Sequence, residues 1–279
     1  SLVFYKIRIP NNKISIFDKI LTVFLGYLII PIILSIPFYF SIYNLTFLNS
    51  YFESISGFTS TGFTIFDNIK HIDQSLILWR SSTQWLGGLY FLFSIIFLID
   101  IYDENFKKTL TNFISFDSSE IFKQAIKIFL LYSVLTLVIF SILNIFSIRS
   151  FNSLNLAFTL ISSGGFLPVN DLSIIIKQNS QIIVLSLLML LSFFSIFFIY
   201  NLIFFRNKNI NFFYEDLHLI VYLIFIVAIF LLFFSFNSDF SINLLSIASS
   251  VSKIGFSLET NQKNLTFVFL VIVIIRRNT

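Results

Sequence analysis

The sequence TSTGF at residues 59–63 recurs as SSGGF at residues 162–166 and as SKIGF at residues 252–256. Each copy carries a hydroxyl side chain three residues before its glycine and follows a long apolar stretch by a similar interval. A single Gly-Phe pair after an apolar stretch is typical of a turn. Three aligned copies indicate instead an internal repeat, in which one structural unit is built three times.

The composition of the chain is that of a membrane protein. Of its 279 residues 57% are hydrophobic and only 11% are charged, whereas a soluble domain is about a quarter charged. The net charge of +4 provides no concentrated basic face, so we expect no nucleic-acid partner. The apolar stretches hold no paired carboxylates or histidines, which an intramembrane enzyme would need. We therefore expect a protein that lies in the lipid bilayer and is not an enzyme.

Apolar stretches of about 20 residues, long enough to span a bilayer, predict five membrane spans and a shortened sixth. They cover residues 20–42, 80–101, 126–148, 181–205, 217–236 and 264–275. The connections after the second and fourth spans are charged, whereas the other connections are semi-apolar, rich in Ser and Thr, and contain the Gly-Phe pairs. Irregular backbone at membrane depth must be enclosed in protein or line a water-filled path. We therefore predict re-entrant loops, each with a short helix at 47–58, 151–161 and 241–251.

Most of the 18 lysines and arginines lie in the N-terminal arm, the two charged links and the C-terminal end. The positive-inside rule therefore predicts a multi-pass protein of the cell (inner) membrane whose N-terminus is cytoplasmic and whose loops enter from the opposite side. The expected fold is an all-α polytopic membrane protein of repeated span–re-entrant loop–span units around a central ion pathway. Its expected parts are a cytoplasmic arm (1–19), a first repeat (20–101), a cytoplasmic link (102–125), a second repeat (126–205), a cytoplasmic link (206–216) and a third repeat (217–279), truncated in its second span.

The loops suggest a chemistry of ion coordination. Glycine reaches backbone conformations closed to other residues, so the residues after each short helix could turn their carbonyl oxygens towards a common axis. Rings of carbonyls replace the hydration shell of a monovalent cation, as in a potassium filter. The C-terminal ends of the short helices would add partial negative charge.

Longer motifs resemble a known family. The segments FESISGFTSTGFT (52–64) and LILWRSSTQWLGGLYFLFSIIFLI (76–99) resemble the first pore loop and following helix of the Trk/Ktr/HKT superfamily of potassium-uptake proteins, closest to the TrkH branch. ISSGGFLPVND (161–171) and SSVSKIGFSLE (249–259) resemble its second and third loops. The resemblance implies a pore-forming subunit of four repeats around one potassium path, often paired as a homodimer. It also implies a cytosolic nucleotide-binding ring as regulatory partner, with potassium as the substrate and no organic cofactor.

The same resemblance assigns the ion-binding filter, which acts mostly through its backbone. Its positions are Thr59, Ser60, Thr61, Gly62, Ser162, Ser163, Gly164, Gly165, Ser252, Lys253, Ile254 and Gly255. Lys253 departs from the pattern, because the family normally has a small hydroxyl there. Its ammonium could point into the filter and repel cations. Alternatively its stem could reach the outer surface, leaving only its carbonyl on the path.

Three charged residues near the loops are candidates for the vestibule or for stabilising a loop. Glu53, which we place just before the first loop helix, could attract cations or cap that helix. Arg80 could fix the loop by pairing with Glu53, Asp67 or Asp73, or it could extend to the membrane interface. Asp171 could lie in the outer vestibule or on a solvated loop.

The sequence thus predicts potassium transport across the membrane. The chain begins without Met, and its last apolar stretch is short, so we expect a fragment that lacks the fourth repeat. These features and Lys253 leave an alternative open, in which the chain is a truncated, non-conducting remnant or a structural subunit of such a system.

Overall fold

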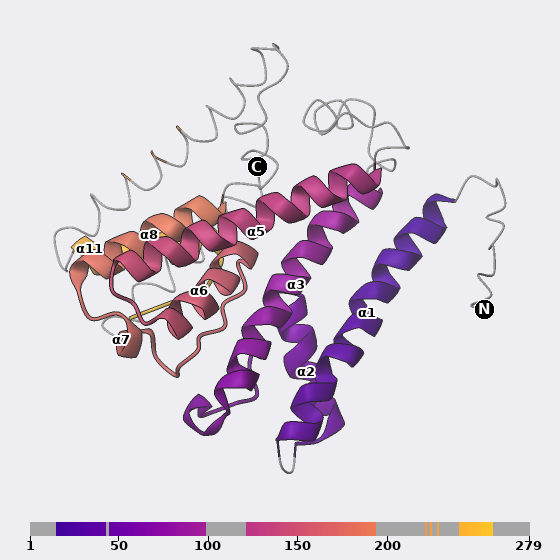
Figure 1. The fold of residues 1–279 in the computed structure, drawn as a ribbon, viewed down its shortest axis with the longest axis horizontal. Coiled ribbons are helices and arrows are strands. Elements are labelled where there is room, and N and C mark those ends of the chain that lie inside the picture. Colours follow the sequence, from indigo (N-terminus) through magenta and orange to yellow (C-terminus); the bar gives the residue numbers. More distant parts are fainter. Residues whose placement is uncertain are drawn as a thin grey trace, which may run out of the picture.

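The computed structural model describes residues 15–42, 45–98, 121–193 and 240–258, with the single residues 221, 224 and 228, and this part of the chain is all-helical (Figure 1). The elements are α1 (Ile16–Ser41), α2 (Phe47–Phe58), the 3-10 turn η1 (Ile69–His71), α3 (Gln74–Leu98), α5 (Ile121–Ile145), α6 (Ser150–Ser162), α7 (Leu172–Ile175), α8 (Asn179–Phe193) and α11 (Phe240–Ser252). The protein is therefore an all-α polytopic membrane protein.

Three helices in the described residues are long and apolar enough to cross a bilayer, namely Ile16–Ser41, Gln74–Leu98 and Ala125–Ile145. They correspond to the first three predicted spans, although α3 begins at Gln74 rather than at residue 80. The first part of the fourth predicted span, 181–205, overlaps α8 (Asn179–Phe193), and the rest of that span lies outside the described residues. The spans predicted at 217–236 and 264–275, apart from three single residues, and most of the cytoplasmic arm and links lie outside the described residues.

The short helices of the three repeats are enclosed by the long ones. In the first repeat α2 packs against α1 and α3, and in the second α6 packs against α3, α5 and α8. In the third, α11 lies beside α8 (Figure 1). Neighbouring repeats are therefore joined through α3 with α6 and through α8 with α11.

The apolar side chains divide between a buried core and an exposed belt. Leu156, Leu160 and Tyr132 are completely buried between α5, α6 and their neighbours. In contrast, α1 leaves large side chains such as Phe17 and Phe40 exposed at 70% and 79% of their surface. In a bilayer such a surface faces acyl chains, which carry no cost of contact with water.

Helix α3 comes close both to α2 of its own repeat and to the second repeat through the glycine pair of its QWLGG motif (residues 84–88). A methyl group on Gly87 would overlap the carbonyl oxygen of Phe58 at the end of α2. A methyl group on Gly88 would lie 2.6 Å from the Tyr132 hydroxyl and 3.0 Å from Cβ of Ser162. The absence of side chains at both positions lets α3 support the ends of α2 and α6 at once.

Candidate functional site

Each of the three short helices ends in the same backbone conformation. The residue two positions before each repeat glycine is left-handed, with φ of 54° at Ser60, 52° at Ser163 and 61° at Lys253. The glycines themselves have φ of 79°, 88° and 82°. A left-handed conformation costs a non-glycine residue about 1 kcal/mol, and such strain persists only where the surroundings impose it. The internal repeat of the sequence is thus also a repeat of loop geometry.

The first two helices end in a Schellman motif, which explains the left-handed turn. In each, the left-handed residue donates its N–H three residues back, and the next residue donates five residues back. These bonds are Ser60 to Gly57 at 2.9 Å, Thr61 to Ser56 at 2.9 Å, Ser163 to Leu160 at 3.2 Å and Gly164 to Thr159 at 2.9 Å. In the third copy Lys253 donates to Ser250 at 3.4 Å. The last helical carbonyls are therefore satisfied, and the chain turns sharply into the loop.

The three loops lie next to one another in chain order. A methyl group on Gly62 would lie 2.7 Å from the carbonyl oxygen of Gly164, and one on Gly165 would lie 2.7 Å from that of Ile254. Each of these oxygens belongs to the residue before the next repeat glycine, so the contacts are equivalent. No atom of the described residues lies within 4 Å of the corresponding position on Gly255. Glycine is thus required both for its φ and for a close approach to a neighbouring carbonyl.

Hydroxyl groups fasten the first two loops to their own helices. Ser56 donates a hydrogen bond to the carbonyl of Phe63 at 2.6 Å, and Thr159 donates to the carbonyl of Phe166 at 2.9 Å. Both hydroxyls stand six residues before the repeat glycine, and Ser249 occupies that position in the third copy. No role was predicted for these hydroxyls from the sequence, although their spacing repeats as regularly as that of the glycines.

Glu53 occupies a different place from the one expected. It lies in the middle of α2 and is completely buried, whereas the N-cap of that helix is Thr46, whose hydroxyl accepts the N–H of Asn49 at 3.3 Å. The expectation that Glu53 precedes and caps the helix is therefore wrong. Its carboxylate accepts hydrogen bonds from Nε of Arg80 at 2.5 Å, the hydroxyl of Thr64 at 3.0 Å and the N–H of Ile65 at 3.0 Å.

Arg80 links the first loop to the second. It is 2% exposed, so its side chain does not extend to the membrane interface. Besides its ion pair with Glu53, it donates from Nη1 to the carbonyl of Leu167 at 3.0 Å. Its guanidinium carbon lies 3.8 Å from the ring centroid of Phe166. Because both charges of the pair are buried, loss of one partner would leave the other uncompensated, at a cost of about 3–5 kcal/mol.

Gln84 of the QWLGG motif supports the second loop from α3. Its side chain is completely buried, and its Oε1 lies 3.0 Å from the Thr159 hydroxyl. A methyl group on Gly164 would overlap the Gln84 amide. The Nε2 atom has no hydrogen-bond partner in the part of the chain that the structure describes. The sequence predicted no role for Gln84.

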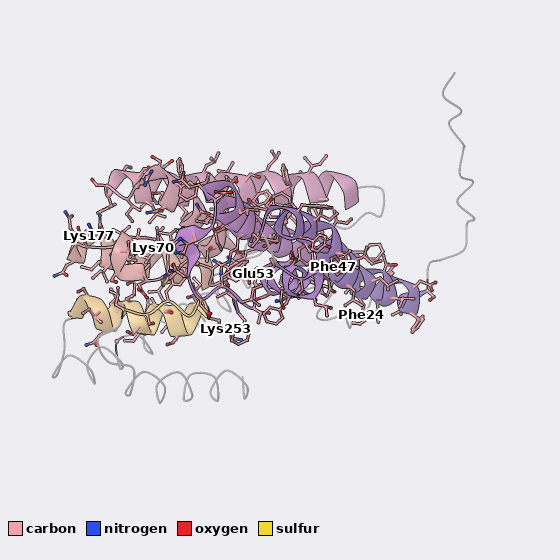
Figure 2. All side chains as sticks on the ribbon, turned by 90° about the horizontal axis from the view of Figure 1, so that it is seen from below. Phe24, Phe47, Glu53, Lys70, Lys177 and Lys253 are labelled. Atoms are coloured by element: carbon pink, nitrogen blue, oxygen red, sulfur yellow. The ribbon has the colours of Figure 1, made fainter. Side chains whose placement is uncertain are left out.

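Lys253 and Asp171 are both exposed. Lys253 directly follows the last residue of α11, at the end of that helix (Figure 2). No carboxylate of the described residues forms an ion pair with it. Asp171 precedes α7 and makes no capping hydrogen bond with its side chain. Within the described residues no cluster of three or more His, Cys, Asp or Glu could hold a metal ion, so the ligands that this site offers are carbonyl and hydroxyl oxygens.

Comparisons with known proteins agree with this geometry. The chain matches no family model. It is 26% identical over 175 residues to an uncharacterized cation transporter of Methanocaldococcus jannaschii, covering 59% of this chain and 35% of the relative. It is 40% identical over 60 residues to the Trk system potassium uptake protein TrkI of Halomonas elongata, covering 22% and 11%. It is 29% identical over 90 residues to TrkH of Escherichia coli, covering 32% and 19%. The chain therefore spans only about a third or less of these relatives.

The fold has a counterpart of known structure. The crystal structure of the potassium transporter TrkH from Vibrio parahaemolyticus matches this chain with a TM-score of 0.71 at 18% identity, covering 94% of this chain and 57% of that one. The equivalent loops of the three repeats, the relatives and this fold agree with one another. By sequence the chain is similar to Trk potassium uptake proteins and to a cation transporter, and it has the fold of TrkH.

Proposed function

We propose that this chain supplies three of the loops that line a potassium path, as the pore-forming part of a Trk-type uptake protein. The contact between each repeat glycine and the carbonyl of the next loop carries this proposal. Segments that touch in chain order, through equivalent atoms, are expected of loops arranged around one path. The relatives, which are named as cation or potassium transporters, support the same function.

The chemistry is dehydration of the ion and its coordination by oxygen atoms, with no covalent step. The carbonyls of Gly164 and Ile254 stand at equivalent positions and, with those of the neighbouring loop residues, replace water around the ion. The C-terminal ends of α2, α6 and α11 add partial negative charge near the loops. Inward movement is driven by the membrane potential, which contributes about 2.3 kcal/mol per charge for each 100 mV.

Lys253 contributes its backbone to the path and keeps its ammonium outside it. Its exposure and its left-handed φ, which it shares with Ser60 and Ser163, support this interpretation. The alternative function is that of a non-conducting remnant or structural subunit. A lysine at a filter position is the observation that favours it, because an ammonium beside the ion would repel cations.

The membrane, the orientation and the partners that we propose for this pore rest on the distribution of basic residues and on the family resemblance. We place it in the inner membrane with a cytoplasmic N-terminus, since basic residues concentrate in the arm and the charged links. A cytosolic nucleotide-binding ring as regulator and a homodimer of pores belong to the proposal through the family resemblance. The buried polar groups described above hold the loops in place, which fits a role in transport rather than catalysis.

Potassium-dependent growth and rubidium uptake test the proposal in bacteria that lack their own potassium uptake. The full-length protein that contains this chain should restore both, and Gly62→Ala should abolish them at an unchanged membrane level. Ser141→Ala, an exposed position on α5, is the matched control and should be neutral. Unchanged uptake and ion preference in Gly62→Ala would refute the role of the loops. Rescue by Lys253→Ser when the parent protein fails would favour the non-conducting alternative.

A further inference from the structure

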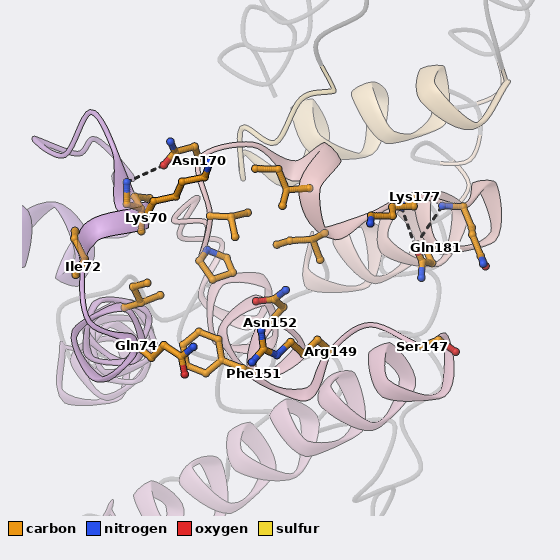
Figure 3. A pocket seen from close by; sticks show the side chains of 17 residues that line it. Lys70, Ile72, Gln74, Ser147, Arg149, Phe151, Asn152, Asn170, Lys177 and Gln181 are labelled. Atoms are coloured by element: carbon orange, nitrogen blue, oxygen red, sulfur yellow. Dashed lines mark hydrogen bonds between the residues drawn. The ribbon is translucent and has the colours of Figure 1, made fainter.

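A hollow of about 650 Å³ lies between the first and second repeats, separate from the loop contacts described above. It is lined by η1, the start of α3, the junction of α5 with α6, and the segment from Pro168 to the start of α8. Its charged lining residues are Lys70, Arg149 and Lys177, and all three are basic. Figure 3 shows Lys70 and Lys177 at opposite sides of the hollow, with Arg149 between them.

Helix ends add to this positive charge. The lining includes Gln74, the first residue of α3, and Arg149, the N-cap of α6. It also includes Gln178, which immediately precedes α8. The N-terminus of a helix carries unpaired N–H groups and a partial positive charge, both of which attract anions. Three helix N-termini and three cations therefore meet around one hollow.

The walls of the hollow are held in place by hydrogen bonds. Asn170 accepts the N–H of Ile69 at 2.8 Å, which joins the two repeats across the hollow. Gln181 accepts the N–H of Lys177 at 2.9 Å and donates to the carbonyl of Phe146 at 3.0 Å. The backbone of the pocket is thus formed in advance, while the basic side chains stay exposed and adjustable.

The basic residues have no protein counter-charge among the described residues. None of them forms an ion pair with a described carboxylate. Asp67, Asp73 and Asp171 are near in sequence, but they are exposed and do not line the hollow. Three positive charges around one hollow raise the electrostatic potential inside it, and a bound anion would lower that potential.

We propose that this pocket binds a phosphate group, carried by the headgroup of an anionic phospholipid or present as free phosphate. Lysine and arginine pair with phosphate through charge-assisted hydrogen bonds, and amide side chains such as Asn152 add donors. Apolar lining residues, among them Ile72 and Phe151, fit the glycerol and first methylenes of a lipid. The size of the hollow and this mixed lining fit a phospholipid headgroup.

Lipid retention by the purified full-length protein tests the proposal. Native mass spectrometry after exchange into micelles with equal phosphatidylglycerol and phosphatidylcholine should show selective retention of phosphatidylglycerol. The triple variant Lys70→Gln/Arg149→Gln/Lys177→Gln should weaken retention about 10-fold, because it removes all three cations that could pair with the phosphate. Arg149→Gln alone should weaken it measurably, whereas Lys127→Gln, which removes an exposed cation from the other end of α5, should not.

Inorganic phosphate distinguishes the two sources. Retention of phosphatidylglycerol that millimolar phosphate does not displace would identify the lipid headgroup as the ligand. Binding of inorganic phosphate that the triple variant loses, with no preference between the lipids, would identify free phosphate. Equal binding of both probes by the parent protein and the triple variant, at matched thermal stability and rubidium uptake, would overturn the proposal.

Discussion

Replacing Glu53 by glutamine tests whether the buried ion pair holds the first two loops together. The carboxylate is completely buried and accepts three donors, from Arg80, Thr64 and Ile65. Glutamine removes the charge and turns an NH2 group towards one of these donors, so the guanidinium of Arg80 is left buried without a counter-charge. We expect the unfolding free energy to fall and the first two loops to lose their register.

The expected loss of unfolding free energy depends on which contacts the remaining partner of the ion pair keeps. Breaking a buried pair costs about 3–5 kcal/mol. After Glu53→Gln, Arg80 still donates to the carbonyl of Leu167 and lies over the ring of Phe166, so about 3 kcal/mol is expected. Arg80→Met leaves the carboxylate with Thr64 and Ile65 and should cost a similar amount. The double variant leaves no unpaired charge, so it should be less destabilised than the sum of the single variants by about 2 kcal/mol.

The assay is SDS titration of the purified full-length protein, combined with rubidium uptake in cells. Asp73→Asn is the matched control, because Asp73 is exposed and forms no ion pair with the described residues. It should change the unfolding free energy by less than about 0.5 kcal/mol. Additive costs in the double variant would show that the two charges do not stabilise each other and would refute the reasoning.

Four other substitutions test the close contacts and the tethers. Gly165→Ala should abolish rubidium uptake, because its methyl group would lie 2.7 Å from the carbonyl oxygen of Ile254. Gly255→Ala should retain more of the rubidium uptake, because no described atom lies within 4 Å of its methyl group. Gly87→Ala should lower the amount of folded protein in membranes, measured by fluorescence-detected size exclusion, because the methyl group would overlap backbone. Thr159→Val should lower the unfolding free energy by about 1 kcal/mol in SDS titration, through loss of its hydrogen bond to Phe166.

Local features of the sequence predicted local structure well. The helix predicted at 47–58 has the bounds of α2, because Thr46 caps its start and a left-handed turn before Gly62 ends it. The repeat was visible because a positive φ and a close backbone contact both demand glycine. The start of α3 was placed too late, since its first turn at Gln74 is too polar to register as part of an apolar span.

Contacts between distant segments could not be read from the sequence. Asp67, Asp73 and Glu53 were equally plausible partners for Arg80, and only the packing of α2 against α3 selects Glu53. The burial of Glu53 likewise depends on an arginine from another helix, so its own surroundings in the sequence suggested a cap. Ser56 differs from these cases, because its spacing to Gly62 repeats and was simply overlooked.

The left-handed turn in these loops is both strained and held in place, which explains how a lysine can occupy a position that is a serine in the other two copies. The left-handed position is occupied by Ser60, Ser163 and Lys253 in the three loops. Lys253 differs from the two serines in its side chain, but all three have nearly the same φ. In the first loop that strained conformation is held by the helix-ending hydrogen bonds and by the tether from Ser56 to the carbonyl of Phe63. Where the surroundings impose a backbone conformation, they constrain φ and ψ more strongly than the identity of the side chain. If the path is lined by carbonyls, what this position must supply is its backbone, and a lysine whose stem stays outside meets that requirement as well as a serine does.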